Sequence, residues 1–313
     1  MFNRRTLVAL STLTLLGAVS GAVPAAASSV SRASTAHLQQ AGSLPTIVIG
    51  SENFPEEEIL GNLYNDVLRH AGFKTQLRSD LGGRPIVDKA LADKALDLFP
   101  DYAGSLLVYL EPKDTAQATQ LSTDIPALEH ALKAQSATVL NAAPAIDTNA
   151  FAVTKATAAQ YKLTDLSSLA SAAPKLTFGA PAECPTYYYC LPGLEKVYGV
   201  HFKAFVPIGE SGPEAAAYLK NNRVQVAEFD SSDGTILENN FVDLTDNKHL
   251  EPADNIIPVI RTAFDTPAVA SALNGLSAKL TTNDLSKLNI DVNEDHEDPG
   301  AAAAQWLKSI GLT

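Results

Sequence analysis

The stretch that decides the fold runs from Ile47 to Leu110 and reads IVIGSENFPEEEILGNLYNDVLRHAGFKTQLRSDLGGRPIVDKALADKALDLFPDYAGSLLVYL. Its apolar residues switch between the two-residue period of a strand and the 3.6-residue period of a helix. The pattern predicts strand, helix, strand, helix and strand, then a Pro-Asp-Tyr turn into another helix. The expected strands are 46–50, 73–78 and 96–99, and the helices begin at Pro55 and after Gly83. This alternation favours a parallel sheet with helices on both faces.

The rest of the chain repeats the same alternation. Further strands are expected at 138–140, 151–154, 176–179, 202–206, 224–229 and 256–261. Further helices are expected at 127–134, 191–198, 214–221, 267–280, 283–288 and 300–310. The chain would cross between two α/β units near Asn149 and cross back near Asp254. We therefore expect one lobe from residues 45–148 and 255–313 and a second from 149–254, and about 270 residues is a suitable length for two domains.

The first 27 residues have the features of an export signal. Arg4 and Arg5 form a basic start, an apolar run extends from Leu7 to Val19, and an Ala25-Ala26-Ala27 cleavage site follows. A membrane anchor is the alternative, but this run is shorter than the roughly 20 residues that a span needs. Residues 28–44 are rich in Ala and Ser and are expected to form a flexible leader. We expect a periplasmic or secreted protein, without a lipid anchor because no cysteine lies near the cleavage site.

The chain has two cysteines, Cys184 and Cys190, with five residues between them. In an oxidising compartment such a pair is expected to form a disulfide. A metal site or a redox pair is the alternative, but no third ligand lies nearby in the sequence. A loop this short removes little chain entropy, so the expected role of the disulfide is to shape a local turn.

The charge of the chain limits its partners. The formal net charge is −12, and it becomes −14 once the two arginines of the signal are removed. An acidic protein without a basic run is a poor ligand for nucleic acid. The same charge is compatible with attraction of a cationic solute.

Several segments resemble one known family, the solute-binding proteins of osmoprotectant ABC importers of the glycine betaine, carnitine and choline class. The similar segments are SENFPEEEILGNLY, LGGRP, LDLFPDYAGSLLVYL, CLPGLEKVYGVHFKAF, VQVAEFDSSDGTI, DNKHLEPADNIIPVIR and DVNEDHEDPGAAAAQWLKSIGL. They follow the order and spacing of the family over nearly the whole chain after the signal. The resemblance implies a type II periplasmic-binding-protein fold with two hinge crossovers. It also implies a monomeric receptor that passes its solute to a permease driven by an ATPase.

The same resemblance implies a site made of aromatic rings. Relatives hold a trimethylammonium group in a cage of tyrosines through cation–π attraction. Tyr102, in PDYAGS, matches the first tyrosine of this cage, although a half-buried tyrosine in a turn is the alternative. Ser105 matches a hydroxyl that contacts the polar end of the ligand in relatives, but it could equally cap a helix.

Four other positions depart from the family pattern. Asn149, Asp230 and Asp254 stand where relatives carry aromatic residues, and Glu57 replaces a glutamine that helps to hold a ligand carboxylate. Carboxylates around one ring would repel an anionic group and favour a cation or a hydroxyl-rich ligand. Alternatively, Glu57 only complements the dipole of its helix and the aspartates only cap turns.

We therefore expect a receptor for a small polar or cationic solute, with no catalytic residue, metal or cofactor, and with glycine betaine itself a doubtful ligand. A second hypothesis is a secreted hydrolase or lyase that uses the cleft carboxylates, and a third is a binding protein for an amine, polyamine, aromatic or polyol ligand. The sequence contains no G-x-S-x-G, phosphate loop or H-E-x-x-H motif to support an enzyme. Tyr187, Tyr188 and Tyr189 lie inside the cysteine loop, where they could supply other aromatic contacts, bind the permease or simply be exposed.

Overall fold

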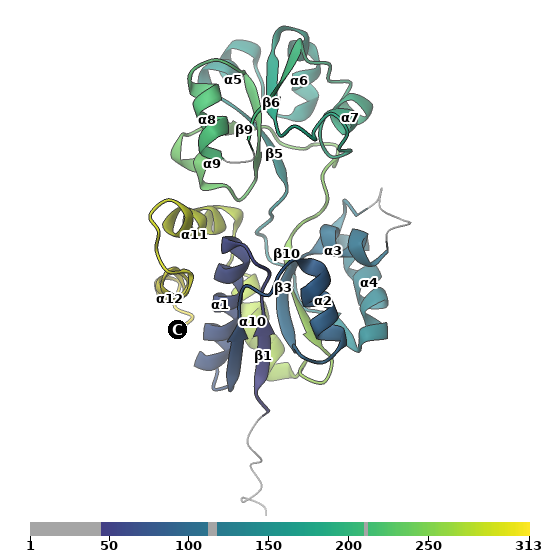
Figure 1. The fold of residues 1–313 in the computed structure, drawn as a ribbon, viewed down its shortest axis with the longest axis vertical. Coiled ribbons are helices and arrows are strands. Elements are labelled where there is room, and N and C mark those ends of the chain that lie inside the picture. Colours follow the sequence, from purple (N-terminus) through teal and green to yellow (C-terminus); the bar gives the residue numbers. More distant parts are fainter. Residues whose placement is uncertain (1–44, 112–117, 210–211) are drawn as a thin grey trace, which may run out of the picture. The chain divides into compact units, whose positions relative to one another are not determined.

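A computed structural model describes residues 45–111, 118–209 and 212–313. The predicted signal peptide and leader, residues 1–44, lie outside the described residues. Two five-stranded sheets form the framework, in the orders β2-β1-β3-β10-β4 and β7-β6-β8-β5-β9. The α/β prediction is therefore confirmed (Figure 1).

The first sheet is built from both ends of the described chain. Its strands are β1 (Ile47–Gly50), β2 (Thr75–Arg78), β3 (Leu98–Tyr102), β4 (Ala137–Val139) and β10 (Ile256–Arg261). β1 is parallel to β2 and β3, whereas β10 is antiparallel to β3 and β4. β10 arrives from the far end of the sequence and completes the sheet.

The prediction of a turn at Pro100-Asp101-Tyr102 is wrong. These three residues continue β3, and they are paired with the first three residues of β10, from Ile256 to Pro258. A partner more than 150 residues away cannot be recognised from local turn propensity, which is why the Pro-Asp pair suggested a turn.

Helices cover both faces of the first sheet. On one face, apolar side chains of β1 pack against α1 (Pro55–His70), α10 (Pro267–Ser277), α11 (Thr282–Asn293) and α12 (Pro299–Ser309). On the other face lie α2 (Arg84–Ala92), α3 (Ala103–Leu110) and α4 (Leu121–Leu132). Side chains of β10 alternate between these two cores: Ile256 and Ile260 face one, and Ile257 and Val259 face the other. A strand covered on both faces is apolar throughout, as IIPVIR is.

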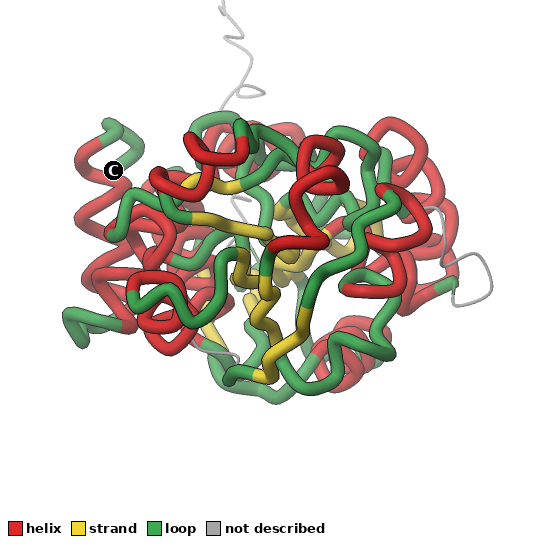
Figure 2. The backbone as a smooth tube through the Cα atoms, turned by 90° about the horizontal axis from the view of Figure 1, so that it is seen from above, coloured by secondary structure: helices red, strands yellow, loops and turns green. Residues whose placement is uncertain are grey.

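The second sheet lies between its own two cores. Its strands are β5 (Asn149–Val153), β6 (Thr177–Ala180), β7 (Ala204–Pro207), β8 (Val226–Asp230) and β9 (Val242–Asp243). Its helices are α5 (Lys155–Tyr161), α6 (Leu166–Ala172), α7 (Leu191–Gly193), α8 (Gly212–Lys220) and α9 (Gly234–Glu238). Phe151 and Phe178 lie in one core, and Ala152 and Phe229 in the other. Seen from above, the strands run through the middle and helices lie outside them (Figure 2).

Two connectors join the sheets, residues 140–148 between β4 and β5 and residues 244–255 between β9 and β10. They lie next to each other, since Ile146 and Asn255 form an antiparallel bridge and the Asp147 amide donates to the Asp254 carbonyl at 3.0 Å. Both connectors can be followed in Figure 1 between β10 and β5. The predicted pair of crossovers is confirmed. In the described part of the chain, no helix is both long and apolar enough to cross a membrane.

Candidate functional site

The ends of strands from both sheets meet at the connectors. Asn149, the first residue of β5, is paired with Asp230, the last residue of β8. In the first sheet, Ile256 at the start of β10 is paired with Tyr102 at the end of β3. The carboxyl ends of strands in α/β sheets are the usual place for a ligand.

A cavity of about 430 Å³, which we name the acidic cavity, lies at this place. Four of the six predicted site residues line it, although they come from four separate segments: Ser105, Asn149, Asp230 and Asp254. The volume falls within the range of roughly 300–1,000 Å³ that is typical of small-molecule sites.

Ser105 fixes the carboxylate of Asp254. The Ser105 amide donates to Oδ1 at 2.6 Å and its hydroxyl donates to Oδ2 at 2.7 Å. Ser105 lies in the first turn of α3, where amide groups have no partner within the helix. Burial raises the pKa of Asp254 to about 6, although both bonds from Ser105 act to lower it.

Asn149 links the tyrosine loop to a buried acid. Its side-chain amide donates to the carbonyl of Tyr189 at 2.9 Å and to Oε2 of Glu251 at 3.1 Å. Glu251 is only 5% exposed, and its Oε1 has no hydrogen-bond partner among the described residues. Burial, with the nearby acids Asp246, Glu228 and Asp254, raises the pKa of Glu251 well above its ordinary value.

The positive charge in the cavity wall is already balanced. Among the described residues that line the acidic cavity, Arg84 is the one base. Its Nε and terminal nitrogen lie 2.8–3.1 Å from the carboxylate of Asp101, and Nε lies 3.9 Å from Glu52. Burial by itself would lower the pKa of Arg84, but the charge and hydrogen bonds of Asp101, with the charges of Glu52 and Asp254, together raise it.

Tyr102 and Glu57 are not among the residues that line the acidic cavity. The ring of Tyr102 is stacked on Phe54 with 6.4 Å between centroids, and its hydroxyl donates to Oε1 of Glu56 at 2.7 Å. Glu57 is fully buried and accepts a bond from the Glu52 amide at 3.1 Å. Burial raises the pKa of Glu57 well above its ordinary value. Their roles as ligand contacts stay predictions.

A second cavity of about 410 Å³ lies beside the first, since Asp147 and Asp230 line both. Glu56, the partner of Tyr102, also lines this second cavity. The amide of Asn289 donates to Glu56 at 2.6 Å and to the Ser232 carbonyl at 3.1 Å. The Ser232 hydroxyl in turn donates to Asp147 at 2.7 Å. These bonds connect α1 and α11 with the loop after β8.

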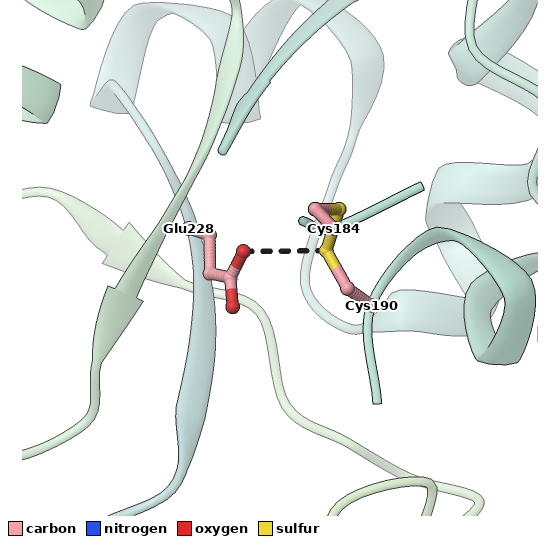
Figure 3. Close-up of side chains that lie close together, drawn as sticks. All are labelled: Cys184, Cys190 and Glu228. Atoms are coloured by element: carbon pink, nitrogen blue, oxygen red, sulfur yellow. Dashed lines mark hydrogen bonds between the residues drawn. A yellow bond between two sulfur atoms is a disulfide. The ribbon is translucent and has the colours of Figure 1, made fainter. Parts of the chain in front are cut away.

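The predicted disulfide between Cys184 and Cys190 is present (Figure 3). The sulfur of Cys190 lies 3.2 Å from Oε2 of Glu228 on β8. A disulfide sulfur carries no proton, so a hydrogen bond here requires a protonated Glu228 that donates. Burial raises the pKa of Glu228 to about 8, in agreement with this. These three residues are close enough to share a metal ion, but disulfide-bonded sulfurs are not thiolate ligands.

The disulfide closes the loop that carries three tyrosines. Tyr187 and Tyr189 line the acidic cavity, and their rings meet edge-on with centroids 5.6 Å apart. Tyr188 touches the ring of Tyr189 in the same manner. The loop therefore brings two rings to a site in which the predicted aromatic positions are occupied by Asn149, Asp230 and Asp254.

Sequence reasoning missed three charged residues of the cavity, Arg84, Asp147 and Glu251. Each lies close in sequence to a segment that had been singled out: Arg84 in LGGRP, Asp147 two residues before Asn149, and Glu251 three residues before Asp254. For Asp147 and Glu251 the position in the two crossovers was the available signal, and for Arg84 it was the LGGRP segment. Their common cavity depends on the pairing of the connectors, which the sequence does not reveal.

Two α/β sheets, two adjacent connectors and a polar cavity at the strand ends define a two-lobed solute-binding protein of type II. The solved structure of a glycine betaine/carnitine/choline ABC transporter has the same fold, with a TM-score of 0.77, 23% identity and coverage of 85% of this chain and 99% of that one. Apo YehZ from Escherichia coli gives a TM-score of 0.76 at 25% identity, with 86% and 99% covered.

Sequence comparison agrees with the fold. The chain is 26% identical to the glycine betaine-binding protein YehZ of Escherichia coli, over 85% of this chain and 91% of YehZ. It is 25% identical to the carnitine transport binding protein OpuCC of Listeria monocytogenes, over 84% and 86% of the two chains. The chain belongs to the family described as the substrate binding domain of ABC-type glycine betaine transport systems, whose model matches residues 45–309. It is a binding receptor that delivers a small solute to a permease, and the hydrolase or lyase hypothesis is not supported.

Proposed function

We propose that the acidic cavity is the solute site and that it takes a small cation with polar groups in preference to a zwitterion. One observation carries this proposal. Ser105, Asn149, Asp230 and Asp254, singled out from four distant segments, line one cavity together with Tyr187 and Tyr189. Tyr102 donates to Glu56, which lines the neighbouring cavity, and Glu57 accepts from the amide of Glu52, the residue near Arg84.

The charges of the cavity support a cation. Asp147, Asp230, Glu251 and Asp254 line it, whereas Arg84 is neutralised by Asp101. In a partly buried site, acids attract a cation more strongly than they would in water. Glycine betaine would bring a carboxylate of its own among these acids. The rings of Tyr187 and Tyr189 can contact an ammonium group by cation–π attraction.

The cellular setting of the receptor follows from the same proposal. Residues 1–27 direct export and are cleaved, and the protein acts outside the cytoplasm as a monomer. It hands its solute to a membrane permease that is driven by an ATPase subunit. Closure of the lobes about the two connectors is the motion expected on capture, by a shift of population toward the closed form.

Calorimetry with four probes tests the ligand class: choline, ethanolamine, putrescine and glycine betaine. We expect at least one of the three cations to bind with one-to-one stoichiometry, about tenfold or more tighter than glycine betaine, because the acids of the cavity attract a cation and disfavour the carboxylate of glycine betaine. The solute should be recovered unchanged after incubation. The proposal is overturned if glycine betaine binds most tightly or if none of the cations binds.

The variant Asp254→Asn tests whether the solute binds in the acidic cavity. It removes one negative charge while keeping an acceptor for Ser105, and we expect weaker cation binding. Asp243→Asn is the control, because Asp243 is an acid of β9 that does not line the acidic cavity. Equal effects of both substitutions would contradict the assignment of the site.

A further inference from the structure

The acids of the acidic cavity differ in how they are held. Asp254 receives two hydrogen bonds from Ser105, and Asp147 receives two from Ser232. Glu251 is different, because Oε2 accepts one bond from Asn149 and Oε1 has no partner in the described part of the chain. A buried carboxylate in that condition is strongly unfavourable unless a positive charge is close or a proton neutralises it.

Among the described residues, every charged group that acts on Glu251 is an acid. These acids are Glu228 on β8, Asp246 in the connector after β9, and Asp254 three residues further along the chain. Asp246 also accepts a hydrogen bond of 2.8 Å from the backbone amide of Glu251. Tyr187 and Tyr189 of the disulfide loop line the same cavity, and the charge of Glu251 acts to raise the pKa of both hydroxyls. On its other side, Glu251 lines a neighbouring cavity together with Asp243, Asp246 and His249.

We infer that Glu251 releases a proton when a cationic solute enters the acidic cavity, so that capture exchanges one cation for one proton. This inference rests on the proposed function. In the exchange, the O–H bond of the Glu251 carboxylic acid breaks, the proton passes to solvent, and the carboxylate left behind is balanced by the charge of the solute. Attraction across a partly buried site can act without direct contact between the solute and Oε1.

The burial of Glu251 supports the same conclusion. Its pKa is raised well above 4.5 in the structure, first by burial and then by the three acids. A cation in the cavity acts in the opposite direction and lowers that pKa, which releases the proton. A zwitterion also brings a negative group, so it lowers the pKa of Glu251 less than a cation does. Glu251 would therefore select solutes by net charge.

The exchange predicts how affinity depends on pH. The protein without solute holds the proton of Glu251 and the complex does not, so higher pH favours the complex. Between the pKa of Glu251 in the complex and its pKa without solute, the affinity should rise by up to about tenfold per pH unit. Above both values it should level off.

Calorimetry with choline, and with ethanolamine as its unmethylated counterpart, measures the proton directly. Each titration is run at pH 7 in phosphate and in HEPES, two buffers with different heats of ionisation. We expect the observed enthalpy to differ between the buffers by an amount that corresponds to about one proton released per bound cation. Binding with the same enthalpy in both buffers would overturn the inference while leaving the proposed function intact.

The variant Glu251→Gln tests whether the released proton comes from this residue. Glutamine keeps an acceptor for Asn149 but cannot titrate, so the difference between buffers and the rise of affinity with pH should both disappear. Asp243→Asn, the matched control, should leave both unchanged. Proton release that persists in Glu251→Gln would transfer the role to another acid such as Asp147 and overturn the inference.

A measurement on the unsubstituted protein covers the case in which the variant fails to fold or neither probe binds. The carboxyl carbon of Glu251, assigned by NMR in protein without solute, should titrate well above 4.5 and be protonated at pH 7. Titration near the ordinary value would overturn the inference. If none of the cationic probes binds but Glu251 titrates well above 4.5 as expected, the proposed function alone is overturned.

Discussion

Ser105 holds both carboxylate oxygens of Asp254, although 149 residues separate the two in the sequence. Ser105 lies in the first turn of α3, and Asp254 lies near the end of the second connector. The pair therefore fixes the connector to the first lobe at the edge of the acidic cavity.

Ser105→Ala should weaken solute binding. It removes the hydroxyl bond to Asp254, and since that bond lowers the pKa of Asp254, the pKa should move further above about 6. Less carboxylate is then present at neutral pH, and we expect a loss of about 1–2 kcal/mol in the binding free energy of a cation, measured by calorimetry. Ser105→Thr keeps a hydroxyl and should be much closer to the parent. Equal affinities of the alanine variant and the parent would contradict this role.

Asp230→Tyr should improve binding of glycine betaine. Asp230 is exposed and lines both cavities, so a ring at this position can reach a trimethylammonium group. Cation–π attraction contributes about 0.5–2 kcal/mol, and removal of the negative charge should help the ligand carboxylate. Asp230→Asn removes the charge without adding a ring, so the difference between the two variants isolates the aromatic contribution. No gain of Asp230→Tyr over Asp230→Asn would argue against loss of the cage as the reason for weak betaine binding.

Replacement of Cys184 and Cys190 by serine should affect both stability and binding. Loss of so short a cross-link is expected to lower the free energy of unfolding by about 2 kcal/mol. Binding should also weaken, because the loop carries Tyr187 and Tyr189 and its Tyr189 carbonyl is held by Asn149. Thermal unfolding and calorimetry, with and without reductant, give the two results. Reductant should reproduce the effect in the parent and leave the double variant unchanged.

Two glycine substitutions should have opposite effects on stability. A Cβ added at Gly104 would lie 2.7 Å from the Cβ of Pro252 and 2.8 Å from the Ala118 carbonyl, so Gly104→Ala should force α3 away from the second connector. Overpacking of this kind costs about 1–3 kcal/mol. Gly275 lies within α10 and has nothing within 4 Å of an added Cβ, so Gly275→Ala should stabilise the protein by about 0.5–1 kcal/mol. Denaturant unfolding measures both changes, and the same sign for both would contradict the packing argument.

The free energy of unfolding should decrease as the pH rises from about 4 to about 8. Burial, together with Glu56, raises the pKa of Asp147 from 3.8 to about 8, so between these values the folded chain holds a proton that the unfolded chain has released. The stabilisation linked to this proton is complete below about pH 4 and is lost as the pH rises to about 8. The unfolding midpoint should be higher at pH 5.5 than at pH 8. Asp147→Asn should reduce this difference, whereas Asp93→Asn, on the exposed surface, should not.

Local sequence was sufficient for most elements. The apolar stripe of α1 and its closure before Gly72 follow from helical periodicity, and the burial of IIPVIR on two faces follows from its continuous apolar character. The pairing of Cys184 with Cys190 also follows, because in a chain with two cysteines each can pair only with the other. The division into two lobes required only the order of these elements.

The site was predictable only in part. Ser105, Asn149, Asp230 and Asp254 could be singled out, but nothing local indicates that Glu251 is buried between two cavities. The continuation of β3 through Tyr102 was also hidden, because its partner β10 comes from the far end of the chain.

The sequence by itself determined most of the elements, their order and the acidic character of the crossover segments, because periodicity and charge are local properties. Tertiary structure alone decided which acids share a cavity, which of them have hydrogen-bond partners and which rings face them. These properties depend on the pairing of the two connectors and on the loss of solvent around each carboxylate, and both arise only when distant segments come together.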